Sequence, residues 1–146
     1  MDQAVQDFVN CKKVAVVGAS RQGNKFGNMA GKELAQRGYE VFYVHPEVTD
    51  IEGIPTYPNL EAVKDQAECV WVSVPSERGE AVLQEAASAG LTKVWLQQGA
   101  ESPELVKSGE ELGLELVAGK CILMYAEPVG SFHKFHQVIW KLIGKY

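Results

Sequence analysis

Short runs of apolar, often β-branched residues alternate along this chain with longer stretches whose apolar residues recur every three or four positions. The short runs predict strands covered on both faces, and the longer stretches predict amphipathic helices. Strands are expected at Lys13 to Gly18, Glu40 to Val44, Glu68 to Val74, Lys93 to Gln97 and Leu114 to Val117. Helices are expected at Phe26 to Arg37, Glu77 to Ala89, Pro103 to Leu112 and Ser131 to Ile143, with short ones before the first strand and near Leu60 to Lys64.

Strands that alternate with helices favour βαβ units and a parallel sheet. We therefore expect one α/β domain over residues 1–146, a Rossmann-like three-layer αβα fold with a parallel five-stranded sheet in the order 3-2-1-4-5. Three prolines between Pro46 and Pro58 leave room for only a short strand there, and Ile54 to Tyr57 is counted as strand three. Right-handed crossovers then place a topological switch point beside the first strand.

Several helix ends carry recognisable signals. Ser76 is expected as an N-cap, and Ser102 precedes a proline at the first helical position. The last helix has Phe132, Phe135, Ile139, Leu142 and Ile143 at helical spacing. This stripe predicts packing against the core, with a homodimer contact as the alternative.

Charge and cysteine content restrict the function classes. Fourteen Lys and Arg residues against 19 Asp and Glu give a net charge of −5, so no general attraction for nucleic acid or an anionic membrane is expected. Any anion site must be local. Three widely spaced cysteines fit neither a disulfide framework nor a metal motif, and no basic leader or long apolar run is seen, so we expect a cytoplasmic protein that binds no metal.

The segment from Gly18 to Gly27 predicts an anion-binding loop between a strand and a helix. A helix N-terminus offers unpaired N–H groups and a partial positive charge, and Arg21 and Lys25 add cationic donors. A tight turn without a ligand is the alternative. The dinucleotide fingerprint fits poorly, because Ser20 replaces its second glycine and the second strand ends at His45 and Pro46 without a carboxylate for a ribose.

Four blocks in a fixed order carry a resemblance: Val16 to Ser20, Gly38 to Val41 with His45 and Pro46, Val72 to Pro75, and Val94 to Ala100. With them the chain resembles the small CoA-binding proteins of bacteria and archaea. Their domain is similar to the amino-terminal domain of the succinyl-CoA synthetase alpha subunit and of ADP-forming acyl-CoA synthetases. The resemblance extends from Lys13 to about Cys121.

The resemblance implies a set of ligand contacts. The phosphates of coenzyme A would face the loop, through Gly18, Ala19, Ser20, Arg21, Lys25, Phe26 and Gly27. His45 and Pro46 would border the adenine and ribose, where many relatives read Asn-Pro. Val74, Pro75 and Ser76 would line the other side, Gln98 and Gly99 would follow along the same edge, and Lys120 would stand in place of an arginine.

The expected function is therefore a stand-alone module that binds coenzyme A or an acyl-CoA, since no catalytic constellation can be assembled from the sequence. An NAD(P)-binding oxidoreductase or redox sensor that uses the same loop is the alternative. A third reading is an interaction subunit of an acyl-CoA synthetase-like partner chain. Cys121 follows Lys120 and is interpreted as an inert thiol, with a reactive thiol as the alternative.

Overall fold

The computed structural model describes residues 3–20 and 25–125. Its elements, in chain order, are α1 (Gln3–Asn10), β1 (Lys13–Val17), α2 (Phe26–Gln36), β2 (Glu40–Val44), β3 (Asp50–Ile51), β4 (Ile54–Pro55), η1 (Glu61–Val63), β5 (Cys69–Val72), α3 (Ser76–Ser88), β6 (Lys93–Gln97), α4 (Pro103–Glu111), β7 (Glu115–Lys120) and η2 (Ile122–Met124). Arg21 and the expected last helix, Ser131 to Ile143, lie outside the described residues.

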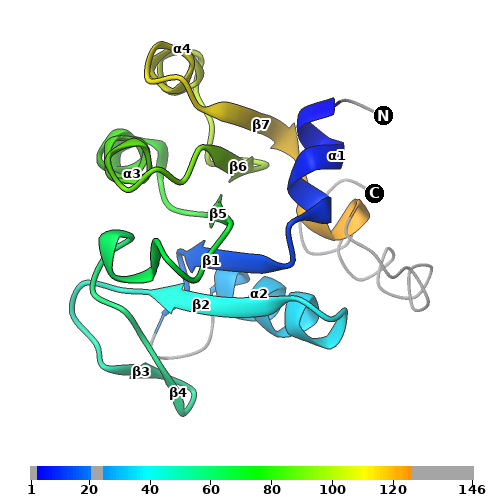
Figure 1. Ribbon diagram of the computed structural model, residues 1–146, viewed down its shortest axis with the longest axis vertical. Coiled ribbons are helices and arrows are strands. Elements are labelled where there is room, and N and C mark those ends of the chain that lie inside the picture. Colours follow the sequence, from blue (N-terminus) through cyan, green and yellow to red (C-terminus); the bar gives the residue numbers. More distant parts are fainter. Residues whose placement is uncertain (1–2, 21–24, 126–146) are drawn as a thin grey trace.

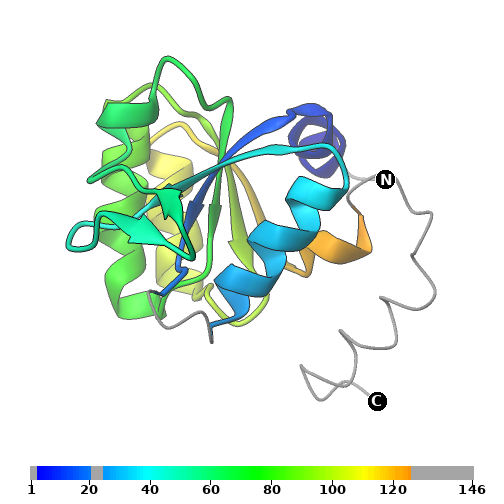
Figure 2. The same cartoon turned by 90° about the horizontal axis from the view of Figure 1, so that it is seen from below.

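Five parallel strands form the central sheet in the order β2-β1-β5-β6-β7, seen from bottom to top in Figure 1. Helices α1 and α2 cover one face of the sheet, and α3 and α4 cover the other (Figure 2). The expected Rossmann-like α/β fold is confirmed. From β1 the chain continues to β2 at one edge of the sheet, and from β5 it continues through β6 to β7 at the other edge. The switch point therefore lies between β1 and β5.

Alternating side chains from the strands fill two apolar layers. Trp71 and Trp95 point toward α1, where Phe8 meets the Trp95 ring with centroids 5.2 Å apart. Val72 and Leu96 point to the other face and pack beneath α3 and α4. All four residues of β5 are buried, which explains why the strands read as continuous apolar runs.

The short segment from Ile54 to Tyr57 differs from the expectation. Ile54 and Pro55 form β4, which pairs antiparallel with β3 in a separate hairpin. Only Tyr57 forms a parallel bridge to the central sheet, at Val44. Pro55 and Pro58 have no N–H to donate, so the segment makes only one step of a ladder beside β2. The fifth place in the sheet belongs to β7.

Candidate functional site

The loops after β1 and β5 touch at the switch point. Gly18 follows β1 with φ +130°, and a Cβ there would collide with the carbonyl oxygen of Ser73 and lie 2.8 Å from its carbonyl carbon. Ser73 N in turn donates a hydrogen bond to Val17 O at 2.8 Å. Only glycine fits this position, because both the backbone angle and the space exclude a side chain. Open α/β sheets bind their ligands in the crevice outside such a point.

Helix α2 begins directly against this loop. A Cβ on Gly27 would lie 2.6 Å from Gly18 O and 2.9 Å from Ala19 N, so the first turn of the helix packs on the loop backbone. Among the described residues, none accepts a hydrogen bond from the N–H groups of Phe26 or Gly27. Lys25 is exposed and immediately precedes them. The start of α2 thus presents free donors and a cation to the carboxyl edge of the sheet.

The side chains of Ala19 and Phe26 point away from this edge. Ala19 is buried in the core, and the Phe26 ring packs toward Trp71 with centroids 6.1 Å apart.

Asn28 holds the loop in shape, and the sequence did not reveal it. Its side chain is 1% exposed and makes four hydrogen bonds. Oδ1 accepts from Ser20 N at 2.8 Å and from Lys25 N at 3.3 Å, while Nδ2 donates to Ser20 O at 2.9 Å. Because the Ser20 amide is committed to Asn28, it is not the group that would meet an anion.

The fourth bond joins Asn28 to the β3–β4 hairpin, through Nδ2 and Glu52 Oε1 at 3.2 Å. Glu52 lies in the hairpin turn with φ +52°, and its other oxygen pairs with Lys32 Nζ at 2.6 Å. A carboxylate can only accept, so Glu52 orients the Asn28 carboxamide with its NH₂ toward the hairpin and its oxygen toward the loop. Glu52 was also absent from the sequence-based candidates.

A hollow of about 300 Å³ opens where β2 ends, lined by His45, Pro46, Glu47, Val48, Thr49, Thr56 and Pro58. His45 Nδ1 accepts from the backbone N–H groups of Glu47 at 3.1 Å and Val48 at 3.3 Å. This pattern places the imidazole proton on Nε2. An asparagine Oδ1 occupies the equivalent position along its side chain, so an asparagine in place of His45 could form the same turn.

The other sequence candidates lie along the same edge. Val74 and Pro75 connect β5 to α3, and Ser76 is the first residue of that helix, one position inside the N-cap expected for it. Gln98 and Gly99 follow β6, and Gln98 N donates to Lys120 O at 3.2 Å at the end of β7. The strand order therefore places Val74 to Ser76 beside Gly18, and Gln98, Gly99 and Lys120 farther from the switch point.

Cys121 is built into the core next to this edge. It is 4% exposed, and burial raises the pKa of its thiol although hydrogen bonds from Gln97 and from the backbone of η2 oppose the shift. A buried thiol with a raised pKa favours the inert interpretation of this residue.

Within residues 3–20 and 25–125, no three His, Cys, Asp or Glu side chains are grouped so that they could hold a metal ion. None of the helices in these ranges is long and apolar enough to cross a membrane. His133 and His136 lie outside the described residues.

The chain is similar in sequence to two curated proteins. Acetate--CoA ligase [ADP-forming] I of Archaeoglobus fulgidus is 28% identical over 137 residues, covering 87% of this chain, and the chain spans only 20% of that ligase. The uncharacterised protein YneT of Bacillus subtilis is 27% identical over 111 residues, which cover 76% of this chain and 82% of YneT.

Among solved structures, a conserved hypothetical protein of Pyrococcus furiosus superposes with a TM-score of 0.71 at 38% identity, covering 76% of this chain and 96% of that one. The model of the CoA binding domain matches residues 12–127. Because this match takes in more than half of the sequence, the chain belongs to the CoA-binding domain family.

Proposed function

We propose that the crevice at the switch point binds coenzyme A or an acyl-CoA. The observation that carries the proposal is the start of α2, where the amides of Phe26 and Gly27 have no acceptor among the described residues. They lie next to exposed Lys25, at a sheet edge that also holds the hollow of His45. A phosphate is stabilised by such amides and by a cation. The net charge of −5 makes this local arrangement the more necessary.

Most of the residues expected from the sequence take a place in this proposal. The ligand phosphates lie against Gly18, Lys25 and Gly27, with Arg21 as a second cation. The adenosine part occupies the hollow beside His45 and Pro46, whose volume of about 300 Å³ lies at the lower end of typical ligand sites.

The remaining candidates border the rest of the ligand. Val74, Pro75 and Ser76 form the opposite wall, and the first turn of α3 begins there. Gln98, Gly99 and Lys120 lie farther along the edge. Among the described residues we assign no nucleophile or general base, and the proposal is one of ligand binding.

Membership of a ligase-related family also supports a proposal about partners. The Archaeoglobus ligase is about five times as long as the matched domain, since the chain spans 20% of it. We propose that this protein works as a single module that presents a CoA species to an acyl-CoA synthetase-like partner chain.

Isothermal titration calorimetry with CoA, acetyl-CoA and NAD⁺ tests the proposed ligand. We expect CoA to bind with one site per chain and NAD⁺ to bind at least tenfold more weakly, because β2 ends without the carboxylate that holds a dinucleotide ribose. NAD⁺ binding without CoA binding at millimolar concentration would falsify the proposal and favour the oxidoreductase reading.

A further inference from the structure

Two cysteines lie together at the end of the sheet opposite the proposed ligand edge. Cys11 connects α1 to β1, and Cys69 is the first residue of β5. Strands β1 and β5 are parallel neighbours, with Val14 opposite Cys69, so both segments enter the sheet side by side.

Backbone contacts hold these two segments together. Glu68 N donates to Lys13 O at 2.7 Å, and Lys12 N donates to the Glu68 carboxylate at 3.0 Å. Cys69 Sγ lies 3.8 Å from the same Lys13 carbonyl oxygen. These bonds hold the segments that carry Cys11 and Cys69 beside each other.

The two thiols lie close enough for each to shift the pKa of the other, and they differ in environment. Cys11 Sγ donates to Asp7 O at 3.5 Å, and Cys69 Sγ donates to Lys13 O at 3.8 Å. Cys69 is buried, whereas Cys11 is only partly buried and opens toward solvent beside exposed Lys12. An external reagent can therefore reach Cys11 first.

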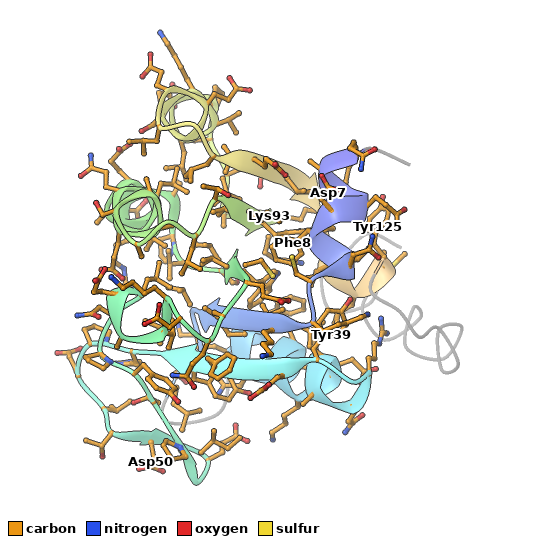
Figure 3. All side chains as sticks on the ribbon, in the orientation of Figure 1. Asp7, Phe8, Tyr39, Asp50, Lys93 and Tyr125 are labelled. Carbon is orange, nitrogen blue, oxygen red and sulfur yellow. The ribbon has the colours of Figure 1, made fainter. Side chains whose placement is uncertain are left out.

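The pKa values of the two thiols are shifted in opposite directions. The hydrogen bond from Cys69, aided by Lys93, lowers the pKa of Cys11 against the opposing effects of burial, Glu68 and Asp7. Burial raises the pKa of Cys69 well above its ordinary value. Figure 3 shows Asp7 on α1 and Lys93 at the start of β6, at this end of the sheet. An accessible thiol with a lowered pKa beside a buried thiol is the usual arrangement of a redox-sensitive pair.

We propose that Cys11 and Cys69 are a modification site that a hydroperoxide converts into a reversible intramolecular disulfide. The Cys11 thiolate attacks the peroxide oxygen, the O–O bond breaks, and a sulfenic acid forms while water or an alcohol leaves. The Cys69 sulfur then attacks the sulfenic sulfur, the S–O bond breaks, and the hydroxyl leaves as water with the Cys69 proton. Two thiols and one hydrogen peroxide thus give one disulfide and two waters.

The fold can accommodate this bond. Helix α1 is anchored through Val5, Phe8 and Val9, which are buried against the sheet. Cys11 and Lys12 lie between α1 and β1, outside both elements, and can shift to bring the sulfurs to bonding distance. The disulfide would then tie α1 to the central sheet. This inference does not depend on the proposed ligand.

Peptide mass spectrometry after treatment with hydrogen peroxide tests the site. The protein is oxidised while folded, unfolded in iodoacetamide and digested without reductant. We expect a linked peptide pair joining Cys11 to Cys69, a mass loss of about 2 Da that dithiothreitol reverses, and iodoacetamide on Cys121 alone.

Matched variants keep the result decisive. Cys121→Ser should form the same linkage, whereas Cys11→Ser should lose it and retain its thermal stability to within a few degrees, because Cys11 is partly exposed. Sulfinic acid on Cys11 without a linked peptide, a disulfide that includes Cys121, or free alkylation of both Cys11 and Cys69 after oxidation would each overturn the proposal.

Discussion

Replacing Asn28 by alanine should weaken the fold and the proposed phosphate site together. The change removes four hydrogen bonds. Water can reach the partners on exposed Lys25 and exposed Glu52, so the main cost comes from the amide and carbonyl of Ser20. At about 1 to 3 kcal/mol for each of these two polar groups left unpaired, we expect a loss of about 2 to 6 kcal/mol. That corresponds to a fall of roughly 10 °C in Tm for a domain of this size.

Ligand affinity should fall as well, because the loop must then be ordered at the expense of binding. Fixing one backbone residue costs about 1 to 2 kcal/mol, so we expect CoA affinity to drop roughly tenfold. Thermal melting of the free protein and calorimetric titration with CoA measure the two effects. The control is Asn59→Ala, since exposed Asn59 makes one local bond, to Ala62 N at 3.0 Å. An Asn28→Ala protein that melts and binds like the Asn59→Ala protein would refute the role assigned to Asn28.

Substitutions at three other positions probe the same edge. Gly27→Ala places a methyl 2.6 Å from Gly18 O, so Tm and CoA affinity should both fall, and normal melting with normal affinity would contradict the close approach of helix and loop. Lys25→Ala should weaken CoA binding by about 1.5 to 3 kcal/mol if it makes a charge-assisted bond, and less at high salt. Calorimetry at two ionic strengths should show no such loss for Lys107→Ala on α4, and equal affinities of the two variants would place the phosphates elsewhere. His45→Asn should bind CoA nearly as well as the natural protein, because its Oδ1 can accept hydrogen bonds from the same two amides. His45→Ala should bind CoA more weakly. If calorimetry gave the reverse order of affinities, forming this turn could not be the role of His45.

The fold was predictable because its signals are local. Strand positions follow from apolar runs that are buried on both faces, as in β5. Ser102 is the N-cap expected from the following proline, and its Oγ accepts from Leu105 N at 3.1 Å. The Ile54 to Tyr57 segment was harder, because a turn at Glu52 and Gly53 folds it back on Asp50 and Ile51 before it can pair with β2.

The site was predictable only as far as its backbone. The motif of Gly18 and the start of α2 can be recognised in the sequence, and so can the pair His45 and Pro46 at the end of β2. Asn28 and Glu52 escaped notice because their bond joins residues 24 positions apart, and no short motif records such a contact. Asn28 directly after Gly27, at a predicted helix start, was the available local signal.

The central claim is that CoA binds at the carboxyl edge of the sheet, with its phosphates at the start of α2. An NMR titration of the ¹⁵N-labelled protein with CoA tests it most directly, because each backbone amide reports separately. We expect the largest shifts at Phe26 and Gly27, further shifts around His45 and Val74 to Ser76, and little change at Cys11 on the opposite edge. Saturable CoA binding that leaves Phe26 and Gly27 unperturbed would contradict the account.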